Sequence, residues 1–289
     1  MSNRKMIAAM GTALMMAAAL ASATTASAQN RRGRAPTPEQ NVAAAQVVAT
    51  AAGLSCQVTE ATLLGKTDGE NADFYEAACA TGPGYLLVAS TPPQSFDCVL
   101  LAAQAQQAAA TPDATPTPTC KLAANQNTDA LIAGYAQAAG VPCTIDAGAP
   151  VGLSEGKTVY EVGCPGTDGY RIEPTATGGW TNMPCLTIVS AGGACRFTTA
   201  DEQYATVKTL LANTEGAACV VDGARHMGGN ANGQFYEAKC SGSEGYILRV
   251  KDNATEQVYR CAIAQPIGGG CTLTPKEVSD AAEDAREAQ

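Results

Sequence analysis

The twelve cysteines of this 289-residue chain fall into three sets of four, and their spacing constrains the fold more than any other feature. In the second and third sets the successive intervals are the same, 21, 21 and 10 residues, whereas the first set has intervals of 23, 19 and 22 residues. A spacing that recurs to the residue indicates that one folded unit has been copied along the chain. The sequence therefore predicts three tandem repeats. Their cysteines are Cys56, Cys79, Cys98 and Cys120; Cys143, Cys164, Cys185 and Cys195; and Cys219, Cys240, Cys261 and Cys271.

The residues between the cysteines recur as well. In every copy a glycine lies nine residues after the first cysteine, a Tyr-Glu pair precedes the second cysteine, and a Gly-Tyr pair follows it. This similarity is internal to the chain. The residues concerned are Gly65, Tyr75-Glu76 and Gly84-Tyr85 in the first copy, Gly152, Tyr160-Glu161 and Gly169-Tyr170 in the second, and Gly228, Tyr236-Glu237 and Gly245-Tyr246 in the third.

Local signals predict a helix followed by a small antiparallel sheet in each copy. Helix caps precede the first cysteine at Thr37, at Asn127 or Thr128, and at Thr199. Runs rich in aromatic and β-branched residues then predict strands, and glycine turns after the second cysteine predict hairpins whose last glycine has a positive φ. The third cysteine is expected on a fourth strand, such as Cys185–Val189. The predicted fold class is α+β: three tandem disulfide-stapled repeats, each a helix plus a small sheet of three or four antiparallel strands, with a C-terminal capping helix.

These signals also predict boundaries along the chain. Residues 104–119 of the first repeat form an insertion whose Pro/Thr-rich composition predicts a loop. Thr274 and Glu277 form a capping box that predicts the start of the C-terminal helix. The expected segments are a signal peptide at 1–28, a flexible tail at 29–37, repeats at 38–125, 126–197 and 198–272, and the C-terminal helix at 273–289.

The pairing of the cysteines follows from the expected strand order, although four cysteines allow three pairings. If the first two strands of a copy are antiparallel, the start of the first lies beside the end of the second, which brings the first and second cysteines together. The third and fourth cysteines flank a short loop in the last two copies. This favours Cys56–Cys79, Cys98–Cys120, Cys143–Cys164, Cys185–Cys195, Cys219–Cys240 and Cys261–Cys271.

The N-terminus has the features of a bacterial secretory signal. Arg4 and Lys5 precede an apolar stretch from Met6 to about Leu20, and Ala26-Ser27-Ala28 matches a cleavage site. The apolar stretch is too short for a permanent membrane span, and no later run is long enough. We therefore expect cleavage near Ala28, no integral membrane span, and a periplasmic or secreted protein, in a compartment where disulfides persist.

Several kinds of chemistry are not predicted. The chain contains no C-x-x-C motif and a single histidine, so we expect no metal site, no cofactor and no thiol redox centre. A net charge of −9 argues against nucleic acid as a partner. His226 is expected in a polar glycine-rich loop without a nucleophile and an orienting acid, so no catalytic residue is predicted. Glu76, Glu161 and Glu237 are interpreted as structural residues that accept hydrogen bonds from a neighbouring loop.

The main hypothesis is a non-enzymatic, disulfide-rich repeat protein that acts as a protein-binding or structural element of the bacterial cell envelope. Its partner would be an unidentified envelope or extracellular protein. The alternatives are a secreted inhibitor of a hydrolase (protease or lysozyme-type) and an extracellular hydrolase with two acidic residues about 5–10 Å apart. Aromatic residues are enriched in interface hot spots. The candidate interaction residues are therefore Trp180, Tyr85, Tyr170 and Tyr246.

Overall fold

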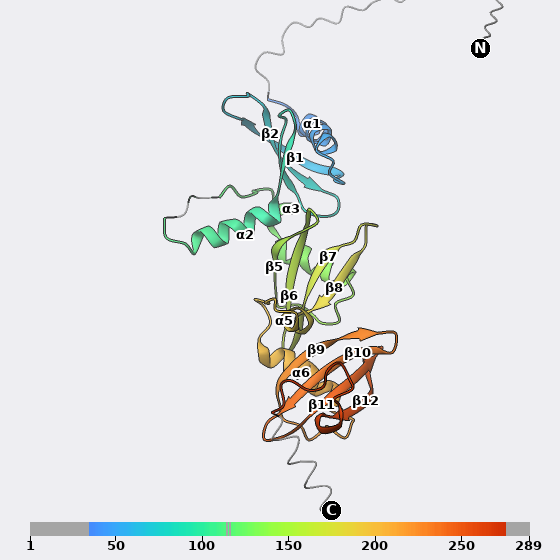
Figure 1. Ribbon diagram of the computed structural model, residues 1–289. Helices are drawn as coiled ribbons and strands as arrows, with labels where there is room; N and C mark the ends of the chain where they lie inside the picture. Colours follow the sequence, from blue (N-terminus) through green and yellow to red (C-terminus); the bar gives the residue numbers. More distant parts are fainter. Residues whose placement is uncertain (1–34, 114, 116, 276–289) are drawn as a thin grey trace, which may run out of the picture. The chain divides into compact units, whose positions relative to one another are not determined.

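The computed structural model describes residues 35–113, 115 and 117–275. This part of the chain forms three four-stranded antiparallel sheets, each made of strands that are consecutive in sequence (Figure 1). The first sheet contains β1 (Val58–Lys66), β2 (Asp73–Cys79), β3 (Tyr85–Val88) and β4 (Gln94–Asp97). The second contains β5 (Ala147–Ser154), β6 (Lys157–Cys164), β7 (Thr167–Pro174) and β8 (Trp180–Pro184). The third contains β9 (Val221–Asn230), β10 (Gly233–Cys240), β11 (Ser243–Lys251) and β12 (Ala254–Arg260).

Some of the expected segments lie outside the described residues. These are the signal peptide at 1–28, residues 29–34 of the tail, and the C-terminal helix from residue 276 onward. Among the helices that the structure describes, none is both long and apolar enough to cross a bilayer.

A helix precedes each sheet in the chain and contacts its strands: α1 (Pro38–Ala51), α4 (Thr128–Ala138) and α6 (Ala200–Leu211). The short helix α3 (Ala123–Gln126) directly precedes α4. The helix caps predicted at Thr37 and Thr199 are confirmed, and both form capping boxes: Thr37 and Gln40 exchange hydrogen bonds at the start of α1, as do Thr199 and Glu202 at α6. At α4 the cap is Asn127, whose side chain accepts a hydrogen bond from the backbone N–H of Ala130.

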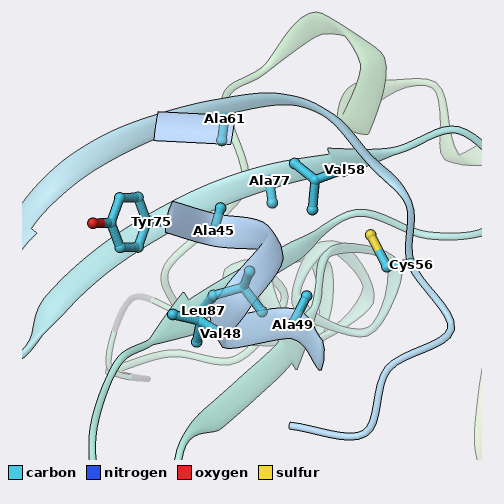
Figure 2. Packing of buried hydrophobic residues seen from close by; sticks show 9 residues of the cluster. All are labelled: Ala45, Val48, Ala49, Cys56, Val58, Ala61, Tyr75, Ala77 and Leu87. Atoms are coloured by element: carbon cyan, nitrogen blue, oxygen red, sulfur yellow. The ribbon is translucent and has the colours of Figure 1, made fainter. Parts of the chain in front are cut away.

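The core beneath α1 consists mostly of small side chains, as Figure 2 shows. Because side chains alternate between the two faces of a strand, Tyr75 and Ala77 of β2 point into this cluster, and Phe74 and Glu76 lie on the opposite face. Small side chains bury little apolar area, so this unit depends more on covalent bridges than an ordinary core would. The cluster contains Ala45, Val48, Ala49, Cys56, Val58, Ala61, Tyr75, Ala77 and Leu87.

The third cysteine of each set begins a helix, and the prediction of a fourth strand at Cys185–Val189 is wrong. The fourth strand is real, but it ends one residue before the cysteine in every sheet. The insertion at 104–119 is also not a loop throughout, because its first residues continue the first of these helices to Ala109. The three helices are α2 (Cys98–Ala109), α5 (Cys185–Ser190) and the 3₁₀ turn η1 (Cys261–Ile263).

A carboxylate caps the first turn of each of these helices by accepting a hydrogen bond from the backbone N–H of the residue after the third cysteine. In the first sheet Asp97 binds Val99 at 2.7 Å, and this cap is local. In the second sheet the cap is Asp168, which lies 18 residues before its donor Leu186 and binds it at 3.0 Å. In the third sheet Glu244 binds Ala262 at 3.0 Å. Anionic groups at helix N-termini stabilise the helix, and two of these three caps exist only in the folded chain.

Asp168 makes a pH-dependent contribution to stability that can be measured. Its burial, with a smaller effect of the nearby Glu202, raises its pKa from 3.8 to about 6, although the hydrogen bond from Leu186 opposes the shift. The folded state therefore binds this proton more tightly than the unfolded chain, so the contribution of Asp168 to stability rises as the pH falls from about 7 to about 4. The Asp168→Asn variant lacks this contribution. We therefore expect its free energy of unfolding to decrease relative to that of the parent protein, by up to about 3 kcal/mol, as the pH is lowered from about 7 to about 4. Urea titrations at several pH values test this, and a difference independent of pH contradicts it.

Helices α2 and α5 also connect successive sheets. Val99 of α2 packs in the buried cluster of the second sheet with Ile132 and Tyr160. Leu186 of α5 packs in the cluster of the third sheet with Val207. Each of these residues directly follows the third cysteine of the preceding set, so the disulfide of one unit positions an apolar side chain in the core of the next.

The two recurring glycine positions require glycine for different physical reasons. The glycine nine residues after the first cysteine lies at a break in strand register in every sheet, which is a β-bulge. The glycine of each Gly-Tyr pair was expected at positive φ, which is wrong: positive φ occurs instead at Gly82, Gly166 and Gly242. The Gly-Tyr glycines are buried where neighbouring atoms leave no room for a side chain. A Cβ on Gly169 would lie 2.1 Å from the Thr198 hydroxyl oxygen and 2.5 Å from the Val162 carbonyl oxygen.

All twelve cysteines are in disulfides, and the pairs are the first-to-second and third-to-fourth pairs that the strand order favoured. Six disulfides indicate an oxidising extracellular or periplasmic environment, because cytosolic thiols are kept reduced. The bridges are Cys56–Cys79, Cys98–Cys120, Cys143–Cys164, Cys185–Cys195, Cys219–Cys240 and Cys261–Cys271.

Candidate functional site

The three repeated glutamates are buried structural anchors, as the sequence predicted. Glu76, Glu161 and Glu237 lie on the second strand of their sheets and are at most 1% exposed. Each carboxylate accepts hydrogen bonds from the backbone N–H groups of the two residues after the fourth cysteine, so it ties the segment leaving the sheet to a central strand. The donors are Lys121 and Leu122 for Glu76, Arg196 and Phe197 for Glu161, and Thr272 and Leu273 for Glu237.

The surroundings of the three carboxylates differ in one respect, the additional donor. Glu237 pairs with the guanidinium Nε of Arg225 at 2.5 Å, and that arginine also donates to the carbonyl oxygen of Gly270 at 3.0 Å. Glu76 instead accepts a hydrogen bond of 3.0 Å from the side-chain amide of Asn125. A buried carboxylate is stable only when donors satisfy it, and this holds for Glu76 and Glu237. In Glu161, Oε2 has no hydrogen-bond partner among the described residues and lies 4.0 Å from Nε of Arg171.

Each anchor glutamate lies close to a disulfide, but this trio is not a metal centre in the structure. The carboxylate and the sulfurs of the third and fourth cysteines lie within 4.8 Å of one another in each sheet. The two sulfurs are bonded to each other, whereas a metal requires the thiolate form. No cofactor site follows from these clusters.

The four aromatic residues expected to contact a partner are partly buried and take part in internal packing. The ring of Trp180 stacks on Tyr135 of α4, with centroids 4.2 Å apart. Tyr85, Tyr170 and Tyr246 are partly buried against the clusters of the first, second and third sheet, respectively. Burial, with a smaller effect of Asp97, raises the pKa of Tyr85 to about 12.

His226 lies on strand β9 and not in a glycine-rich loop. Its Nε2 is 2.8 Å from the side-chain oxygen of Gln234, and its backbone N–H donates to the Ser190 hydroxyl at 2.7 Å. Its ring lies 5.2 Å from that of Tyr236, measured between centroids. The hydrogen bond to Ser190 ties α5 to the first strand of the third sheet.

Part of the opposite face of each sheet, away from α1, α4 and α6, is accessible to solvent. On this face every sheet carries a groove, with a volume of about 620 Å³ on the first, 500 Å³ on the second and 410 Å³ on the third. We call them the first, second and third groove. Each groove is lined by a large side chain from the fourth strand of its sheet, at the position two residues before the third cysteine. These residues are Phe96, which is 43% exposed, Met183, which is 51% exposed, and the half-buried Tyr259.

The first groove is the largest and has the most elaborate wall. Its lining is mainly apolar, with Phe74, Leu86 and Val88 from the sheet joined by Leu101 of α2. The insertion of the first unit supplies a side wall through Gln104, Thr117 and Pro118. The remaining lining residues are Thr67, Asp68, Glu70, Ser90, Gln94 and Phe96.

The second and third grooves contain basic side chains. Arg171 and Glu173 line the second groove. Nη2 of Arg171 donates a hydrogen bond of 2.6 Å to the carbonyl oxygen of Ala194. Arg249 lines the third groove and pairs with Glu256 at 3.1 Å. The three grooves therefore share a position but differ in charge.

The grooves were not predicted, although part of their signal is present in the sequence. A large apolar or aromatic residue two positions before the third cysteine recurs in all three copies and faces away from the helix by strand alternation. Searches of protein-family models, of curated proteins and of solved structures find no match to this chain. The functional assignment therefore rests on the grooves themselves.

Proposed function

We propose that this chain is an exported, non-enzymatic repeat protein that binds another protein of the bacterial cell envelope through the sheet faces opposite α1, α4 and α6. In this proposal the three helix-and-sheet units are tandem copies, and residues 1–28 are a signal peptide that is cleaved near Ala28. The recurrence of the bulge glycine, the anchor glutamate and the cysteine pairing in each unit supports the tandem arrangement.

One observation carries the binding proposal: each of the three sheets has a groove at the equivalent position, with a large apolar or aromatic side chain on its fourth strand. Burying a sheet face is the usual fate of apolar side chains in a folded domain. Exposed apolar surface that recurs at one structural position is typical of an interaction site. A series of neighbouring units presents such surface over an extended length, which suits a protein partner better than a small molecule.

A triple variant tests this function. We expect Phe96→Ser, Met183→Ser and Tyr259→Ser, combined, to weaken at least tenfold the capture of a specific envelope protein from the bacterium that produces the chain. The control is Val47→Ser with Val220→Ser, which replaces two exposed apolar side chains outside the grooves. Quantitative mass spectrometry of cross-linked envelope fractions measures the capture. Equal capture by the triple variant and the parent protein would show that the grooves are not the binding surface.

A further inference from the structure

The first groove differs from the other two in the sign of its charge. Asp68 and Glu70 lie at its rim, and none of its lining residues is a lysine or an arginine. The second groove contains Arg171 beside Glu173, and the third contains Arg249. Only the first groove therefore combines an apolar floor with an unbalanced negative rim.

The basic residue at the base of the same turn is engaged elsewhere. Lys66 precedes the turn between β1 and β2, and its ammonium group pairs with Asp73 at 2.8 Å. It also donates a hydrogen bond to the carbonyl oxygen of Asn71 at 3.2 Å. The charge of Lys66 is therefore balanced by Asp73, although Lys66 and Glu70 line a second hollow beside the turn. Asp68 and Glu70 are exposed and accessible to a ligand.

The floor of the first groove is suited to apolar side chains. Leu86, Val88 and Leu101 are buried at its base, and Phe74 and Phe96 present aromatic rings between this base and the solvent. A volume of about 620 Å³ lies within the usual range for ligand sites. The face of an aromatic ring also attracts a guanidinium or ammonium group, so Phe96 can contact either an apolar or a cationic side chain.

We propose that the first groove binds a cationic amphipathic peptide segment of its partner. Apolar side chains of the segment would occupy the floor over Phe74 and Phe96, and lysine or arginine side chains would pair with Asp68 and Glu70. This inference rests on the proposed protein-binding function and specifies the partner chemistry of one groove. The charge difference distinguishes the first groove from the other two, because a cationic segment that suits the first groove meets a basic residue in each of the others.

Peptide binding to the full mature chain tests the proposal. The probes are fluorescent hexapeptides with blocked termini in which leucine alternates with arginine, with glutamine or with glutamate. We expect fluorescence anisotropy at low salt to show about tenfold tighter binding of the arginine peptide than of the glutamine peptide, and weaker binding still of the glutamate peptide. Replacing both rim acids, Asp68→Asn with Glu70→Gln, should lower the affinity for the arginine peptide by about three- to tenfold and leave the affinity for the glutamine peptide unchanged.

A matched control separates a local site from general attraction to an acidic protein. Glu155→Gln with Asp252→Asn changes the net charge by the same amount in exposed turns of the other two sheets, and we expect it to leave binding of the arginine peptide unchanged. Equal losses in the rim variant and this control overturn the proposal, as does the absence of measurable binding of the arginine peptide. If Phe96→Ser abolishes peptide binding but the rim variant does not, the groove binds peptides without the cationic preference. That result overturns this inference while leaving the proposed function standing.

Discussion

Replacement of Glu237 with alanine is expected to lower the free energy of unfolding by about 3–5 kcal/mol, the range found when one partner of a buried ion pair is removed. The carboxylate is fully buried and accepts hydrogen bonds from the backbone of Thr272, Leu273 and Thr274 as well as from Arg225. Its removal leaves the guanidinium without its anion and several N–H groups without acceptors, inside a region with little access to water. Chemical denaturation followed by circular dichroism measures the change.

The matched control is Glu256→Ala on the same sheet. Glu256 also pairs with an arginine, Arg249, at 3.1 Å, but its side chain is 42% exposed. An ion pair at the surface contributes at most about 1 kcal/mol, so we expect a small change in this variant. Similar losses in the two variants would mean that Glu237 is not the anchor of the segment after Cys271.

Removal of the Cys56–Cys79 disulfide is the second change with a large expected effect. In the chain-entropy account, closing a loop of this length stabilises the folded state by about 3 kcal/mol. The cluster that it supports contains four alanines among its nine residues, as Figure 2 shows, so the apolar contribution that remains is small. We expect Cys56→Ala with Cys79→Ala to lose about 3 kcal/mol and to make the first unit the earliest site of proteolysis.

Limited proteolysis with mass mapping of the cleavage sites distinguishes a local effect from a general one. Val47→Ala is the control, because this residue of α1 is 69% exposed and its truncation should change stability by less than about 0.5 kcal/mol. A loss below about 1 kcal/mol in the double variant would contradict the dependence of this small core on its bridge.

Several structural features could be read directly from local patterns. The capping residues Thr37 and Thr199 predicted helix starts because a side chain and a backbone N–H three residues apart interact within one turn. The antiparallel relation of the first two strands placed the first and second cysteines together, since a hairpin brings its outer ends into contact. The interpretation of Glu237 as a residue that binds a loop followed from its recurrence, because equivalent carboxylates in separate units do not form one catalytic site.

The segment after β8 shows where such patterns fail. Leu186 to Val189 contains β-branched residues that favour a strand, yet it forms α5. The deciding interactions come from elsewhere: Asp168 caps the first turn from another strand, and Leu186 is buried in the cluster of the next sheet. Trp180 is similar, because only the fold shows that its ring is stacked on Tyr135.

The sequence alone predicted the order of the leading helices and the strands, favoured the observed partners of the twelve cysteines and indicated the role of the anchor glutamates, because covalent spacing and strand alternation act over short distances along the chain. It missed the helices α2 and α5, which begin at third cysteines. The tertiary structure alone decided which aromatic side chains are packed and which sheet faces stay open. Phe96 and Trp180 are both large side chains on fourth strands, but one lines a groove and the other lies under α4. The face that a helix covers depends on contacts between residues far apart in the sequence, and the first groove exists only because the β1–β2 turn, the sheet and the insertion line one hollow.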